Sequence, residues 1–153
     1  MAAERDGETN AHSEPIHVAH AAALERPGAR IHVCPAGRRV TVLRDPRGQL
    51  RCVDSVCYHA GGPLGHGPLE EVNGQSCIVC PWHSYKITLD HGEKLYRATE
   101  MSPDGKLVPV GWRSAGVRQR CHLAYEEDGE VFVKLNRGAA ELPSDKYACR
   151  PLS

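Results

Sequence analysis

Short runs in which hydrophobic and polar residues alternate dominate the chain from residue 30 to residue 135. Residues 31–33 and 40–42 show this pattern, and the turn sequence Pro35-Ala36-Gly37 separates them. A period of two places one side of a segment against a core and leaves the other in water, which is typical of a β-strand. The pattern therefore predicts strands joined by tight turns.

Similar runs recur further along the chain. We expect additional strands at 50–53, 76–79, 85–89, 94–97, 117–125 and 131–133, and a short helical turn at 19–24. Turn signals rich in Gly, Pro and Asp separate them, at 45–48, 90–92, 104–105 and 128–129. Residues 101–116 lack clear periodicity and are expected to form a long surface loop. The fold class predicted from these elements is all-β, as a sandwich or a barrel.

The length of 153 residues is that of one ordinary domain. Residues 1–14 are polar and charged without apolar periodicity, and we expect a disordered leader there. The folded domain is expected at 15–137, and residues 138–153 form a C-terminal tail of undefined structure.

Composition narrows the classes of partner. Hydrophobic residues make up 41% and charged residues 25%, as in soluble globular proteins. The 19 Lys and Arg balance the 19 Asp and Glu, which argues against a nucleic-acid partner. No apolar run approaches the length of a membrane span, and the acidic start MAAERDGETN is unlike a signal peptide. We therefore expect a cytoplasmic protein with no membrane contact, in which seven cysteines do not form a disulfide framework.

Two short clusters, Cys57-Tyr58-His59 and Cys80-Pro81-Trp82-His83, carry the strongest chemical signal. Each offers one thiolate and one imidazole, and nearby glycines and prolines predict irregular loops at both. Two Cys and two His could hold a single zinc ion, or two irons with unlike ligands. Zinc fingers usually group Cys with Cys and His with His, whereas each cluster here is mixed, which favours the two irons.

The pattern C-x-H followed by C-P-W-H resembles the Rieske iron–sulfur fingerprint. The longer segments CYHAGGPL and CPWHSYKITLDHGE resemble soluble Rieske-type ferredoxins, and the similarity covers about residues 16 to 135. It implies a Rieske-type antiparallel β-sandwich with a small cluster-binding subdomain made of two hairpin loops. It also implies one [2Fe-2S] cluster with Cys57, His59, Cys80 and His83 as ligands. The imidazoles would lie at the exposed tip and the thiolates deeper.

Departures from high-potential Rieske centres indicate a low reduction potential. Those centres carry an additional disulfide, and the matching positions here are Gly62 and Trp82. They also use a Ser and a Tyr to donate hydrogen bonds to sulfur, and these positions hold Tyr85 and Ile87. Fewer donors leave the more negative reduced cluster less stabilised. Ser84 replaces the Gly that is common after the second His.

A cluster whose protein ligands are all in place has no open position for a substrate. We therefore expect no enzyme activity, and a monomeric one-electron carrier that docks a reductase and an acceptor transiently near His59 and His83. In oxygenases that share this domain, a separate domain binds iron through two His and a carboxylate, and only His91 and His122 follow His83 here. The alternatives are a small Rieske subunit of a larger redox complex and a structural zinc-binding module.

Other notable side chains have ordinary structural interpretations. Trp82 is expected to pack beneath the loops, His66 and His91 to be solvated, and Arg113 to Arg120 to form a solvated basic face. Buried core positions are predicted for Cys34, Cys52, Cys77 and Cys121.

Overall fold

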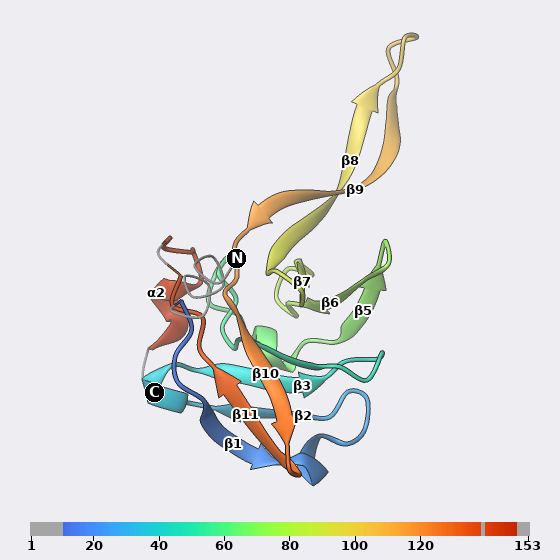
Figure 1. The fold of residues 1–153 in the computed structure, drawn as a ribbon. Helices are drawn as coiled ribbons and strands as arrows, with labels where there is room; N and C mark the ends of the chain where they lie inside the picture. Colours follow the sequence, from blue (N-terminus) through green and yellow to red (C-terminus); the bar gives the residue numbers. More distant parts are fainter. Residues whose placement is uncertain (1–10, 139, 150–153) are drawn as a thin grey trace, which may run out of the picture.

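The computed structural model describes residues 11–138 and 140–149, and their regular structure is mainly antiparallel strands in two sheets (Figure 1). The first sheet has six strands, in the order β1 (Ile16–His20), β11 (Glu130–Lys134), β10 (Cys121–Glu127), β4 (Leu50–Asp54), β3 (Val40–Arg44) and β2 (Arg30–Val33). The second has five, in the order β5 (Leu69–Val72), β6 (Gln75–Val79), β7 (Lys86–Thr88), β8 (Glu93–Met101) and β9 (Leu107–Val117). The all-β prediction is confirmed.

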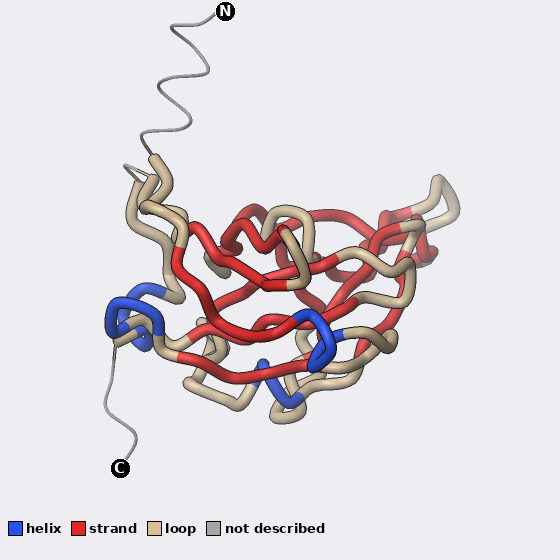
Figure 2. Tube along the Cα trace, turned by 60° about the horizontal axis from the view of Figure 1, so that its bottom comes forward, coloured by secondary structure: helices blue, strands red, loops and turns tan. Residues whose placement is uncertain are grey.

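Helical segments are short and lie at the periphery of the strands (Figure 2). They are 3-10 turns at Ala21–Leu24, Pro35–Gly37 and Leu64–His66, and one turn of α-helix, α2 (Asp145–Ala148). Within the described ranges, no helix has the length and apolar character needed to cross a membrane.

The main hydrophobic cluster takes side chains from both sheets and from the loops between them. Its buried members are Leu43, Val53, Cys57, Leu64, Ile78, Cys80, Ile87 and Leu89. A second cluster packs on the opposite side of the six-stranded sheet, and consists of Leu24, Val40, Val42, Cys52, Val131, Val133 and Leu135. Successive residues of β3 point to opposite faces, so this strand contributes to both clusters. The thiols of Cys57 and Cys80 are therefore positioned by the packing of the core.

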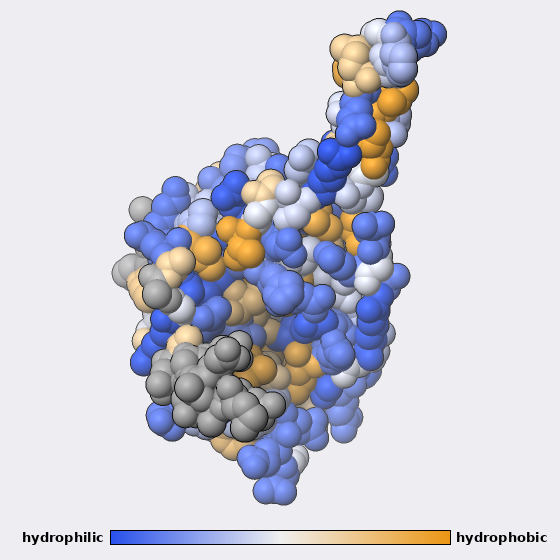
Figure 3. Space-filling view, turned by 45° about the horizontal axis from the view of Figure 1, so that its top comes forward, coloured by the Kyte–Doolittle hydropathy of each residue, from blue (hydrophilic) through white to orange (hydrophobic). Residues whose placement is uncertain are grey.

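Strands β8 and β9 continue beyond the sheet as a long hairpin that projects from the molecule (Figure 1). The expectation of a surface loop at 101–116 is wrong, because residues 107–117 pair with β8. A ribbon with solvent on both sides needs no alternation of apolar and polar residues, so its sequence carries no period of two. Apolar side chains gather along one side of it (Figure 3), and Met101 and Leu107 are 65% and 67% exposed.

The folded part of the chain begins earlier than expected, and it contains one additional strand. Residues 1–10 lie outside the described part, but His12 forms a bridge with Asn136, and the Ser13 amide donates to the Leu135 carbonyl at 2.8 Å. Ordered pairing thus begins before residue 15. Strand β5, which the sequence pattern did not predict, forms the outer edge of the five-stranded sheet.

The cysteines outside the two clusters are only partly as expected. Cys52 and Cys77 are buried, as predicted, and Cys121 is partly buried. Cys34 is exposed, so its core assignment is wrong. It lies in the connection between β2, which is an edge strand of the six-stranded sheet, and a 3-10 turn.

Candidate metal centre

Two loops bring the four expected ligands to one end of the main core. In the first loop, which follows β4, the Cys57 amide donates to the Gly62 carbonyl at 2.8 Å, and the Gly61 amide donates back to the Cys57 carbonyl at 3.0 Å. In the second, between β6 and β7, the Cys80 amide donates to the Tyr85 carbonyl at 2.9 Å. Each loop therefore begins at a cysteine in the core and carries its histidine two or three residues further out.

The thiols and the imidazoles form two distinct pairs. Cys57 and Cys80 are 1% and 2% exposed, whereas His59 and His83 are both exposed. Burial and the neighbouring Cys80 thiol raise the pKa of Cys57 to about 12, against the opposing effect of the His59 and Ala60 amides. The two imidazole rings lie edge to face, with centroids 4.9 Å apart. The two sulfur atoms are thus inside and the imidazole rings outside.

This arrangement suits a group larger than a single ion. Four ligands around one zinc, with bonds of about 2.0–2.3 Å, would lie within about 4 Å of one another. Among residues 11–138 and 140–149, only one group places three metal-binding atoms within 4.8 Å of one another, and it lies elsewhere, on β1 and β11. Gly62 also leaves space beside sulfur, because a Cβ there would lie 2.9 Å from Cys80 Sγ. Two thiols and two separate imidazoles fit the donor set of a two-iron, two-sulfide cluster.

Tyr85 lies over one of the imidazoles. Its ring stacks on that of His59 with centroids 4.2 Å apart, and its hydroxyl is 3.2 Å from His59 Nε2. The contact engages Nε2 and leaves Nδ1 of His59 for a metal. On its other side, the Lys94 Nζ lies 4.4 Å from the Tyr85 ring centroid, which links the start of the projecting hairpin to the site.

The first loop is fixed by a buried glutamine, Gln119, which no motif or periodic pattern singles out. Gln119 donates through Nε2 to the carbonyls of Asp54, at 3.0 Å, and of Val56, at 2.7 Å. Its Oε1 accepts the Tyr58 amide at 2.9 Å, although the two residues are 61 positions apart. One amide side chain therefore satisfies three backbone groups around Cys57.

A buried ionic network lies behind this loop, centred on Asp54. Its carboxylate accepts hydrogen bonds from Arg38 Nε at 2.8 Å and from Ser144 Oγ at 2.7 Å. His122 accepts the Asn136 amide at Nδ1, so its proton is on Nε2 and points to Asp54 at 2.8 Å. Burial alone would raise the pKa of Asp54, but hydrogen bonds from His122 and Arg38 lower it, so the carboxylate is ionised.

The network continues into the C-terminal segment. Arg120 donates from Nε and Nη2 to the two oxygens of Asp145, each at 2.9 Å, and this interaction lowers the pKa of Asp145. Arg38 reaches the same carboxylate at 2.6 Å. The expectation that Arg113 to Arg120 is a solvated basic face is therefore wrong for Arg120, which is 5% exposed. A fully paired guanidinium can be buried where an unpaired one cannot.

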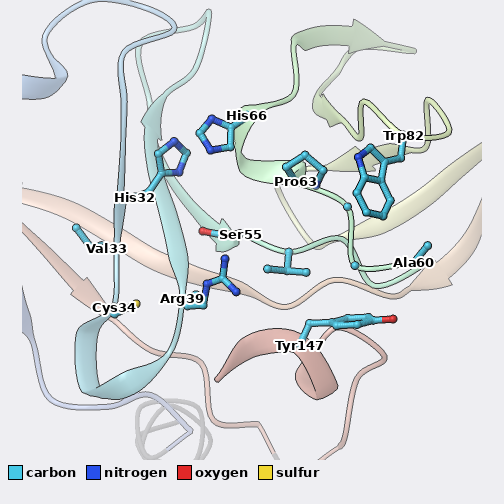
Figure 4. Close-up of a pocket in the computed structure, with 13 residues that line it drawn as sticks. His32, Val33, Cys34, Arg39, Ser55, Ala60, Pro63, His66, Trp82 and Tyr147 are labelled. Atoms are coloured by element: carbon cyan, nitrogen blue, oxygen red, sulfur yellow. The ribbon is translucent and has the colours of Figure 1, made fainter. Parts of the chain in front are cut away.

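A groove of about 740 Å³ runs beside the first loop, with His32, His66, Trp82 and Tyr147 among its lining residues (Figure 4). Trp82 is 56% exposed, so the expectation that it packs beneath the loops is wrong. A Cβ on Gly62 would lie 3.0 Å from the Trp82 ring, which shows that the ring covers Gly62 from outside. His66 and His91 are exposed, as expected.

Comparison with known proteins establishes the family. The model of a family described as soluble Rieske-type ferredoxin matches residues 18–138. The chain belongs to this family. A human Rieske domain-containing protein is 40% identical over 110 residues, which are 72% of this chain and 69% of that protein. The Rieske family implies a [2Fe-2S] cluster.

Larger redox enzymes share the domain. The oxygenase component of a 3-ketosteroid-9-alpha-monooxygenase from Rhodococcus rhodochrous is 42% identical over 97 residues, 63% of this chain but only 21% of that protein. Among solved structures, the ferredoxin of carbazole 1,9a-dioxygenase from Nocardioides aromaticivorans IC177 has the same fold. Its TM-score is 0.56 at 22% identity, over 79% of this chain and 97% of that one.

Proposed function

We propose that this protein is a one-electron carrier whose [2Fe-2S] cluster is held by Cys57 and Cys80 on one iron and by His59 and His83 on the other. The observation that carries the proposal is the separation of the four side chains into a buried thiol pair and an exposed imidazole pair. A bound cluster takes up and releases one electron at a time.

The residues around the cluster would determine from which side a partner can exchange an electron with it. The core around Cys57 and Cys80 excludes water from the thiolates, and the backbone amides of His59 and Ala60 face the Cys57 sulfur. The exposed imidazoles would give a partner its shortest approach. Because all four side chains are ligands, no position is left for a substrate, and the protein would have no catalysis of its own.

The partners would be a reductase and an acceptor enzyme that dock over His59 and His83. Trp82 and Lys94 lie close to this tip and offer one apolar and one cationic contact. Redox encounters of this kind usually bury little surface, which suits a monomer that exchanges partners quickly. Seven cysteines without a disulfide suit a reducing compartment such as the cytoplasm.

We further propose a low reduction potential for this centre. Gly62 and Trp82 cannot form a disulfide, and Ile87 is a fully buried apolar residue with no hydroxyl to donate to sulfur. The Tyr85 hydroxyl contacts His59. A redox titration should therefore give a midpoint in the lower part of the Rieske range, and a value above about +100 mV would contradict this part of the proposal.

The test of the function is metal analysis with electron paramagnetic resonance of the dithionite-reduced protein. We expect iron and acid-labile sulfide in equal amounts and a Rieske-type spectrum. His83→Ala should abolish the spectrum, whereas Cys77→Ser, a buried thiol outside the two loops, should leave it intact. Zinc in place of iron, or an unchanged spectrum in His83→Ala, would overturn the assignment.

A further inference from the structure

Two imidazoles and one carboxylate converge at the edge of the six-stranded sheet, on elements that contribute nothing to the two loops. His17 Nε2 lies 2.8 Å from one oxygen of Glu130, and His20 Nδ1 lies 2.8 Å from the other. The three side chains offer ligand atoms that all lie within 4.8 Å of one another, the one such group in the part of the chain that the structure describes.

A β-bulge creates this arrangement. In a regular strand, residues three positions apart point to opposite faces, so His17 and His20 would be separated by the sheet. The pairing of β1 with β11 shifts between His17 and Ala19, so that His17 lies opposite Phe132 and His20 lies opposite Glu130. Phe132 and Glu130 are two residues apart and share a face of β11. The extra residue in β1 therefore turns both imidazoles toward the same carboxylate.

Simple ion pairing explains each contact but gives no reason for two imidazoles to meet at one carboxylate. Exposed pairs of this kind contribute about 0–1 kcal/mol each, and one carboxylate gains little from a second imidazole. Two nitrogen ligands and one oxygen ligand are, by contrast, a donor set that suits zinc, nickel or copper. With bonds of about 2.0–2.2 Å, ligands on one ion lie at most about 4.4 Å apart, so small side-chain rotations would be enough.

We propose that His17, His20 and Glu130 form a binding site for a divalent transition-metal ion of the zinc type. Their side chains are 48%, 79% and 34% exposed, so the remaining coordination positions face solvent. A bound ion would fasten β1 to β11, and with it the start of the folded chain.

The site is independent of the iron–sulfur loops, so it can be tested in the iron-loaded protein. Zinc is added in a calorimetric titration at mildly alkaline pH, while the visible absorbance of the cluster is followed to show that the iron is not displaced. The background for every variant is Cys34→Ser with Cys149→Ser, because these two exposed thiols could bind zinc by themselves. We expect one zinc ion per chain and a raised melting temperature.

Three substitutions decide the assignment. Glu130→Gln keeps the size and hydrogen-bonding capacity of the side chain but removes its charge, and it should weaken zinc binding at least about tenfold, as should His17→Asn. The control is His91→Asn, an exposed histidine in the turn before β8, which should leave binding unchanged. Zinc binding that is absent in the background protein, or that survives both Glu130→Gln and His17→Asn, would overturn the proposal.

Discussion

The two loops that carry the expected ligands are closed in the same way but are supported differently. In each loop the cysteine amide donates to the carbonyl five residues further on, and the amide four residues further on donates to the cysteine carbonyl. The first loop also has partners far along the chain, above all Gln119 and the network around Asp54. The first loop therefore depends on distant parts of the fold in addition to its own backbone.

This difference predicts which loop responds to substitutions far along the chain. We expect the second loop to form once β6 and β7 pair. The full set of contacts around Cys57 also requires Gln119, in the segment before β10, and the C-terminal residues Ser144 and Asp145. Substitutions in these distant partners should therefore disturb the first loop and leave the second intact.

The largest effect is expected for Asp54→Asn. This change removes a buried carboxylate and leaves Arg38, which is 16% exposed, with only part of its charge balanced. Breaking a buried ion pair by removing one partner costs about 3–5 kcal/mol of stability. Urea unfolding followed by circular dichroism measures this change.

The matched control for Asp54→Asn is Glu71→Gln, which breaks the ion pair of Glu71 with Arg47. Those side chains are 60% and 51% exposed, so a loss below about 1 kcal/mol is expected. Equal losses for the two variants would mean that the Asp54 network does not support the first loop.

A smaller effect is expected for Gln119→Leu, which leaves the Tyr58 amide and two carbonyls without their partner. Each buried group left unsatisfied costs about 1–3 kcal/mol, and the lower end of that range applies where water can reach the half-buried Tyr58 amide. Hydrogen exchange should accelerate at the Tyr58 amide, while the Ser84 amide keeps its protection.

Gln119→Glu gives a sharper version of this experiment. It retains an acceptor for Tyr58 and loses the two donors, so protection at Tyr58 should return in part. Faster exchange at Ser84 in either variant would show that the two loops are not supported separately.

The smallest effect is a gain, expected for Ser84→Gly in the second loop. Ser84 has φ of 57°, in the left-handed region that favours glycine, which explains why Gly is common at this position. Relief of this strain, less the greater chain entropy of glycine, should stabilise the protein by about 0.5 kcal/mol. Asn73→Gly, at a turn residue with φ of 53°, should gain less, because Asn tolerates this region. A loss of stability in Ser84→Gly would contradict the local account of this loop.

Local signals in the sequence predicted much of this molecule. The turn at 45–48, the strands on either side of it and the two ligand clusters are all set by neighbouring residues, and the structure has strands at Val40–Arg44 and Leu50–Asp54. The β8–β9 hairpin was predicted only at 94–97, and its exposed remainder was missed because exposed strands leave no periodic pattern. Gln119 and Arg120 were missed because their partners are distant in sequence, and an amide or a guanidinium in a strand usually faces water.

The ionic network also has a consequence for where the protein may be shortened. The expected boundary after residue 137 would remove Ser144 and Asp145, which bond to Asp54 and to both buried arginines. A truncation there would leave Arg120 without its carboxylate partner and Arg38 with Asp54 alone, directly behind the first loop. Fusion partners and purification tags are therefore better attached beyond residue 149, and a crystallisation variant should keep α2.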